Sequence, residues 1–160
     1  MIGHVSLHND EFITAGMEIA LAAAENAWRE HDDVPVGAVI LDPNGALIAM
    51  GVNRRELDHD PTAHAEVVAI RAAGERLDNW RLDGCTLVVT LEPCAMCAGA
   101  ILQSRISRLV FGAWDEKGGA VGSVVDLIRD PRALSKVEVM AGVFAERSSA
   151  LLKEFFSDSR

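Results

Sequence analysis

The chain has no long uninterrupted apolar run. A membrane-spanning helix needs about 18 or more consecutive apolar residues, and no segment of this sequence approaches that length. The first ten residues also lack the basic stretch followed by an apolar run that marks a secretory signal. We therefore expect a cytoplasmic protein with no membrane partner.

Cysteine is scarce, with three residues at positions 85, 94 and 97. An odd number of cysteines in a chain without an export signal argues against a disulfide framework. Reduced thiols favour metal binding or thiol chemistry instead. The close pair, Cys94 and Cys97, is therefore the first candidate for a metal site.

Basic residues are also few, with 15 Lys and Arg against 24 Asp and Glu and a net charge of −9. Taken alone, this balance argues against a nucleic-acid partner, because phosphates are contacted mainly by Lys and Arg. The acidity, however, lies in residues 1–80, whereas residues 81–160 carry ten charges of each sign. A polyanion could approach that second half, although ordinary solvated charges are the competing interpretation. Its basic residues include Arg105, Arg108, Lys117, Arg129, Arg132 and Lys136.

The composition suits a folded protein, since 49% of the 160 residues are hydrophobic. This length and this apolar fraction predict one domain over residues 1–160. Apolar residues recurring at steps of three and four predict an amphipathic helix over 10–29. Two β-rich runs joined by Asp42-Pro43-Asn44-Gly45 predict a hairpin. The predicted strands are 36–41, 46–52, 86–90, 106–111 and 137–141, and the further helices are 62–76, 94–102, a short one at 125–129, and 144–156.

This alternation of helices and strands predicts an α/β layered sheet. The only glycine-dense piece is residues 117–123. It lacks the Gly-Lys-Ser/Thr order of a phosphate-binding P-loop, so we interpret it as a flexible loop.

Two short motifs carry the chemistry. His64-Ala65-Glu66 and Pro93-Cys94-Ala95-Met96-Cys97 supply three zinc-type ligands and one further carboxylate. A structural zinc is normally closed by four protein ligands, whereas a catalytic zinc keeps three and leaves a fourth position for water. Glu66 could take a proton from that water and deliver it to a leaving group. The motifs therefore predict a hydrolytic site with one Zn²⁺ held by His64, Cys94 and Cys97.

Helix geometry restricts how these residues can meet. Cys94 and Cys97 are three positions apart and project from one helical face. His64 and Glu66 are two positions apart, or about 200° around a helix axis, so they cannot share a face in mid-helix. Both reach one site only if the helix tip points at the metal, with His64 at or before the first turn and Glu66 just inside it. Glu92, near the second helix start, we interpret as a structural or capping residue.

Three alternatives remain open from the residues alone. Cys85 could be a fourth ligand, which would make the zinc site structural. Cys94 and Cys97 could form a redox pair, although His64 and Glu66 would then have no purpose. His64 could also be an ordinary core histidine.

A His-x-Glu motif followed by Pro-Cys-x-x-Cys is the signature of zinc-dependent nucleobase deaminases. The match extends to further segments, and from about Asp10 to Phe156 the chain resembles the bacterial tRNA-specific adenosine deaminases. The resemblance implies a three-layer α/β/α cytidine deaminase-like fold with a central five-stranded mixed sheet. It also implies a homodimer with one zinc ion per subunit. The segments are Val34-Pro-Val-Gly-Ala-Val39, Asp60-Pro-Thr-Ala-His-Ala-Glu66, Leu91-Glu-Pro-Cys-Ala-Met-Cys-Ala-Gly-Ala100, Ser104-Arg-Ile106 and Val110-Phe-Gly-Ala113.

The resemblance further implies roles for individual residues. His64, Cys94 and Cys97 would hold zinc, and Glu66 would shuttle protons while activated water attacks C6 of the wobble adenosine in a tRNA anticodon stem-loop. The products would be inosine and ammonia, and the partner subunit would help to bind the anticodon loop. The expected substrate contacts are Asn53 to the base, the backbone from Val36 to Ala38 along the pocket, Asp115 near the ribose, and Lys117 to a phosphate.

Two positions depart from the family pattern. A basic tail commonly follows the paired phenylalanines, but here Phe155-Phe156 precedes Ser157-Asp158-Ser159-Arg160. Trp114 stands where a smaller or basic residue is common, and it could either stack on a nucleotide or cover the edge of the core. Two other functions also fit the motifs: a zinc-dependent deaminase of a free base or nucleoside of the guanine, cytosine or adenosine type, and a zinc-stabilised RNA-binding module without catalysis.

Overall fold

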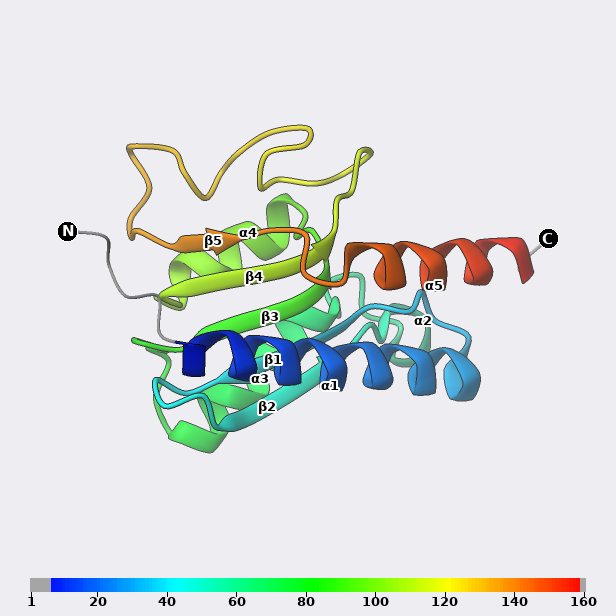
Figure 1. Ribbon diagram of the computed structural model, residues 1–160, viewed down its shortest axis with the longest axis horizontal. Coiled ribbons are helices and arrows are strands. Elements are labelled where there is room, and N and C mark those ends of the chain that lie inside the picture. The colour runs from blue at the N-terminus through cyan, green and yellow to red at the C-terminus, as the bar shows by residue number, and fades with distance from the viewer. Residues whose placement is uncertain (1–6, 159–160) are drawn as a thin grey trace.

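The computed structural model describes residues 7–158, with side chains from residue 11 onward. Helices and strands alternate along these residues, as the sequence predicts (Figure 1). The elements in chain order are α1 (Leu7–His31), β1 (Gly37–Leu41), β2 (Leu47–Val52), α2 (Arg55–Asp58), α3 (Ala65–Leu77), β3 (Thr86–Leu91), α4 (Ala95–Gln103), β4 (Arg108–Ala113), β5 (Glu138–Met140) and α5 (Ala145–Asp158).

The strands form one mixed five-stranded sheet in the order β2-β1-β3-β4-β5. β1 is antiparallel to both β2 and β3, whereas β3, β4 and β5 run parallel. The α/β prediction and its central mixed sheet are therefore confirmed. None of the helices between residues 7 and 158 is long and apolar enough to cross a membrane.

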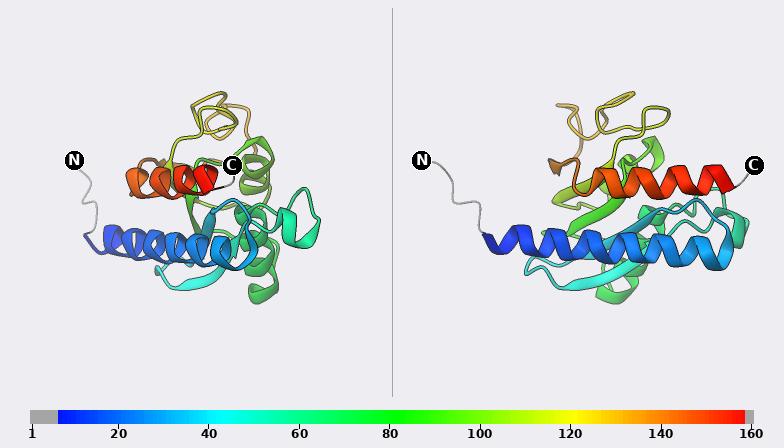
Figure 2. Two further views of the ribbon diagram at one scale, coloured as in Figure 1. Left: turned by 90° about the vertical axis from the view of Figure 1, so that its right-hand side faces the viewer. Right: turned by 45° about the vertical axis from the view of Figure 1, so that its right-hand side comes forward.

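Helices cover both faces of the sheet. Figures 1 and 2 show α1 and α5 side by side on one face and α3 and α4 on the other. Successive β1 side chains alternate between the two cores, with Ala38 and Ile40 on the α3/α4 side and Val39 and Leu41 on the α1/α5 side. Because both faces are buried, the central strands carry runs of apolar residues, such as Leu87–Val89 and Leu109–Phe111, rather than an apolar residue at every second position.

The helix α3 lies directly on β2. A Cβ atom placed on Gly51 would fall 2.5 Å from the carbonyl oxygen of Ala65 and 2.6 Å from the backbone nitrogen of Ala69. Only glycine allows this close approach. The contact fixes the first turn of α3 beside the sheet. This turn lies at the same end of the sheet as the connection from β3 to α4.

The predicted helix at 125–129 is wrong. Residues 121–130 form turns, with an isolated antiparallel bridge between Val121 and Asp126. The backbone N–H of Leu127 donates to Ala120 and that of Gly122 donates to Val125, so these groups are unavailable for a helical ladder. Hydrogen bonds to neighbouring loop residues therefore override the local helix pattern.

The helix α3 begins at Ala65, later than the predicted start at position 62. A turn precedes it, because the Asp60 carboxylate accepts hydrogen bonds from the backbone N–H and the hydroxyl of Thr62, each at 2.8 Å. The short helix α2 was not predicted. Residues 53–64, which include α2, therefore form a compact connection at one end of the sheet.

Candidate active site

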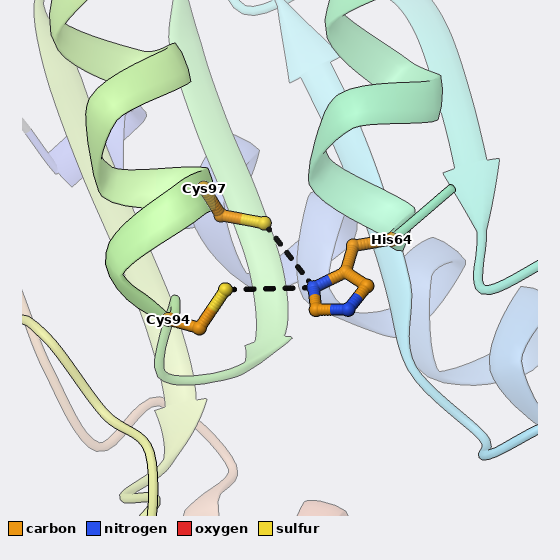
Figure 3. A group of neighbouring side chains, drawn as sticks. All are labelled: His64, Cys94 and Cys97. Carbon is orange, nitrogen blue, oxygen red and sulfur yellow. Dashed lines mark hydrogen bonds between the residues drawn. The ribbon is translucent and has the colours of Figure 1, made fainter. Parts of the chain in front are cut away.

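The two chemical motifs meet at two helix N-termini. His64 is the residue before α3, Cys94 is the residue before α4, and both have extended backbone angles. Neither side chain caps its own helix by a hydrogen bond. Each is therefore free to face the other helix, as Figure 3 shows. This arrangement confirms the predicted geometry, with His64 before the first turn and Glu66 just inside it.

The three candidate ligands lie close together. The Sγ atoms of Cys94 and Cys97 are each 3.5 Å from Nδ1 of His64 (Figure 3). All three ligand atoms lie within 4.8 Å of one another. Zinc bonds of about 2.3 Å to sulfur and about 2.0 Å to nitrogen place tetrahedral N and S ligands about 3.5 Å apart. The donor set and its spacing therefore fit one zinc ion.

Cys85 does not belong to this group. It precedes β3 and is buried among the apolar side chains of the α3/α4 core. Within the part of the chain that the structure describes, the ligand group consists of His64, Cys94 and Cys97. This set has three protein ligands, which is the pattern of a catalytic zinc rather than a structural one.

The thiols of the two cysteines have opposed pKa shifts. Cys97 hydrogen-bonds to Cys94, and this bond together with the one from His64 lowers the pKa of Cys94 to about 3 against the cost of burial. The same bond and its own burial raise the pKa of Cys97. The hydrogen bond to Cys94 raises the pKa of His64. A stabilised thiolate at a helix N-terminus is a competent metal ligand.

Glu66 lies inside the first turn of α3 and is only 4% exposed. Burial raises the pKa of its carboxyl group, although the hydrogen bond from Cys97 and the charge of His64 oppose this shift. A buried carboxyl group with a raised pKa holds a proton more readily than an exposed one, so it can deliver a proton as well as accept one. Glu66 is therefore suited to proton transfer beside the ligand group.

A cavity of about 140 Å³ opens at these residues. It is several times larger than the roughly 10–15 Å³ that a single water molecule requires. Three of the predicted substrate contacts, Val36, Asn53 and Asp115, line it together with His64, Glu66 and Cys94. The other lining residues are Val34, Arg55, Ala65, Leu91 and Glu92.

Two predicted substrate contacts lie elsewhere. Ala38 is fully buried within the sheet, where it pairs with Gly51 and Val89, and it does not line the cavity. Lys117 lines a neighbouring groove instead. Of the predicted backbone segment from Val36 to Ala38, Val36 lines the cavity.

Arg55 was not predicted, and a buried carboxylate explains its position. Asp33 is 2% exposed, and its two oxygens accept the backbone N–H groups of Glu56 and Leu57 at 3.1 and 3.3 Å. These bonds satisfy the first turn of α2. They hold Arg55, whose N–H also donates to Asn53 Oδ1 at 3.2 Å, beside the cavity.

Glu92 is structural, as the sequence suggested, and it anchors the glycine-rich loop. Its carboxylate accepts the backbone N–H groups of Asp115, Val121 and Ser123 at 3.0, 2.9 and 3.2 Å, and also the Ser123 hydroxyl. Burial would raise the pKa of Glu92, but these hydrogen bonds outweigh it and lower the pKa. The loop 117–123 is therefore held to the end of β3 at several points, in contrast to the flexible loop expected.

Comparison with known proteins agrees with this geometry. The family model of the cytidine and deoxycytidylate deaminase zinc-binding region matches residues 10–113. A tRNA-specific adenosine deaminase of Haemophilus influenzae is 47% identical over 150 residues, which cover 94% of this chain and 86% of the relative.

Solved structures show the same fold. One from work on A-to-I editing by tRNA:A34 deaminases at the wobble position of transfer RNA has a TM-score of 0.82 and 46% identity. The match covers 87% of this chain and 99% of that one. A guanine deaminase from Nitrosomonas europaea has a TM-score of 0.69 and 29% identity, covering 91% and 82%.

The fold and the site thus define a zinc-type deaminase, and the chain belongs to the cytidine and deoxycytidylate deaminase family. Within that family, its curated relatives place it among the tRNA-specific adenosine deaminases.

Proposed function

We propose that this protein hydrolyses adenosine to inosine at the wobble position of a tRNA anticodon and releases ammonia. One observation carries the proposal. His64, Cys94 and Cys97 form a three-ligand site beside the buried Glu66, in a chain that is 47% identical to a tRNA-specific adenosine deaminase. The alternative of a free-base deaminase has weaker support. The guanine deaminase from Nitrosomonas europaea is 29% identical, and a guanine deaminase from Bacillus subtilis, although 40% identical, matches only 62% of this chain with a TM-score of 0.60.

His64, Cys94 and Cys97 would hold one zinc ion in each subunit. When bound, zinc acts as a Lewis acid and lowers the pKa of coordinated water to about 7. Glu66 would carry a proton to N1 of the adenine and then to the departing ammonia. Because its carboxyl group is buried at the cavity wall, the proton is exchanged out of contact with bulk water.

The cavity residues would orient the base. Asn53 would contact the base through its side-chain amide, the Val36 backbone would line the pocket, and Asp115 would lie near the ribose. Lys117, in the adjoining groove, would reach a phosphate. An adenosine must leave the base stack to enter so small a cavity, and a single-stranded anticodon loop makes this inexpensive.

We further infer a homodimer in which the partner subunit helps to bind the anticodon loop. The segment between β4 and β5, residues 114–137, extends beyond the sheet edge (Figure 1). It carries exposed apolar side chains that would be covered in a dimer, namely Val124, Val125, Leu127 and Leu134. One deaminase domain over residues 1–160 and a cytoplasmic location complete the proposal.

The substrate is tested by incubating the purified protein with bulk tRNA, with an anticodon stem-loop hairpin, and separately with free adenosine, guanine and cytidine. Inosine in RNA is measured by nucleoside mass spectrometry, and ammonia by a coupled assay. We expect inosine in the RNA samples only. Turnover of the free compounds alone would refute the RNA substrate, and RNA binding without turnover would support the non-enzymatic module instead.

A further inference from the structure

A second hollow adjoins the catalytic cavity. It is a groove of about 1060 Å³ that shares Val34, Leu91 and Asp115 with the cavity. One side is residues 113–117 at the end of β4 and just beyond it, and the other is the face of α5 that ends at Phe156. A substrate that fills the cavity with one base can continue into this groove, because Asp115 lines both. Another hollow shares Val34, Asn53 and Arg55 with the cavity, but the carboxylates of Asp32, Asp33 and Glu56 line it and disfavour a phosphate chain there.

Trp114 presents a fixed aromatic face in the groove. The residue is 48% exposed. It meets the buried Phe111 ring edge-on, with centroids 4.9 Å apart at 86°. On another side it lies against Gly122, where an added Cβ would be 3.5 Å from the ring. These contacts restrain the indole while the residue as a whole stays about half exposed, so little conformational freedom is lost when a flat ligand covers it.

The charges of the groove favour stacking over phosphate pairing. Lys117 and Lys153 line it, but so do the carboxylates of Asp115, Glu116 and Glu146. This mixed lining cannot attract a phosphate chain strongly by charge alone. Aromatic side chains bind any nucleobase through its π-face, whatever the local charge.

We propose that Trp114 is the stacking platform for the nucleotide next to the target adenosine. The inference rests on the proposed RNA substrate and adds to it the residue that holds the flanking base. The base of the neighbouring nucleotide lies against the open indole face while the target base occupies the cavity. Phe156, 55% exposed on the opposite wall, encloses the same space.

The test compares Trp114→Ala, Trp114→Leu and Trp114→Phe on an anticodon hairpin and on two hairpins that carry an abasic residue on one side of the adenosine. On the intact hairpin, we expect kcat/KM to fall about 5- to 150-fold for the Ala and Leu variants, the range for removal of a stacked aromatic. The Phe variant retains most activity. Trp114→Leu preserves apolar packing against Phe111. A loss of kcat/KM in this variant therefore reports on stacking rather than on covering of the core.

The abasic hairpins decide the proposal. On the hairpin that lacks the contacted base, wild type and Trp114→Ala should have equal kcat/KM. An equal deficit of Trp114→Ala on all three hairpins would overturn the proposal, as would full activity of Trp114→Ala or Trp114→Leu on the intact hairpin. A change of oligomeric state in sedimentation would assign Trp114 to a subunit contact and overturn it as well.

Trp80 provides the matched control. It is 62% exposed and lies outside both the cavity and the groove. Trp80→Ala should leave kcat/KM unchanged on every hairpin, while zinc content and thermal midpoint verify that each variant is folded. If the wild type converts no hairpin, the proposed function fails together with this inference. If the wild type is active and Trp114→Ala matches it, the inference alone fails.

Discussion

A glutamate is seldom fully buried without a partner, yet Glu66 lies buried within the first turn of α3 beside three candidate zinc ligands. At the scale of single residues, the site consists of one imidazole, two thiols and this carboxyl group. The pKa shifts follow from their contacts: the hydrogen bonds to Cys94 lower its pKa, and burial raises that of Glu66. The lowered pKa favours a Cys94 thiolate, which can bind a metal, and the raised pKa of Glu66 favours a carboxyl group that can hold a proton.

Replacement of Glu66 tests proton transfer. Glu66→Ala should retain zinc and fold but lose about 10²- to 10⁴-fold in kcat, which is the usual contribution of a general acid–base group. The measurements are single-turnover rates and zinc content by mass spectrometry. Glu75→Ala, which changes an exposed glutamate of the same helix, should leave the rate unchanged. Retained turnover in Glu66→Ala would contradict the mechanism.

A pair of serine variants tests the ligand set. Cys94→Ser should reduce bound zinc from one ion per chain to a small fraction, because a hydroxyl replaces a thiolate ligand. Cys85→Ser changes a buried cysteine outside the ligand group and should keep its zinc, with some loss of stability. Zinc stoichiometry after gel filtration distinguishes the two. Loss of zinc from Cys85→Ser would make the site a closed, structural one.

At the scale of elements, the site depends on where α3 and α4 begin and on what holds the chain after β4. The helix starts bring His64 and Cys94 face to face. Glu92, two residues before Cys94, accepts hydrogen bonds from the backbone N–H groups of Asp115, Val121 and Ser123. A single carboxylate therefore links the metal-binding turn to the segment that carries Asp115 and Trp114.

Glu92→Gln tests this link. The amide nitrogen would face N–H donors and leave at least one of them without an acceptor, at a cost of about 1–3 kcal/mol in the free energy of unfolding. We also expect KM for the RNA hairpin to rise more than kcat falls, because Asp115 is displaced. Denaturant unfolding and steady-state kinetics measure both. Glu75→Gln, which changes an exposed glutamate outside the cavity and the groove, is the control, and equal behaviour of the two variants would count against the anchoring role.

At the scale of the whole molecule, helices bury both faces of the sheet, while the segment 114–137 leaves apolar side chains exposed. In the chain, the exposed apolar residues of this segment come after residues 113–117, which line the groove. A dimer contact there would place a second subunit near the RNA path. Assembly and substrate binding would then depend on the same segment.

Val124→Glu tests the assembly. Val124 is 55% exposed, so the change should leave the fold intact but convert a dimer into monomers through the burial of an unpaired charge. Sedimentation velocity measures the state, and RNA deamination should fall with it. Leu77→Glu, at an exposed apolar position at the end of α3, should remain dimeric. A dimer that survives Val124→Glu would exclude this surface as the interface.

Residues close together in the chain were enough to predict the type of fold and the chemistry. The apolar run Thr86–Thr90 predicted a buried strand, and the two motifs predicted the ligands and the proton carrier, because periodicity and ligand chemistry are properties of residues close together in the chain. The pocket wall, the position of Arg55 and the anchoring of the glycine-rich loop depend instead on how distant segments meet in the folded chain. Asp33 and Glu92 make hydrogen bonds to backbone groups 23 or more residues away, and such bonds leave no periodic pattern. For the same reason the helix expected at 125–129 is absent: its backbone groups find partners in the folded loop.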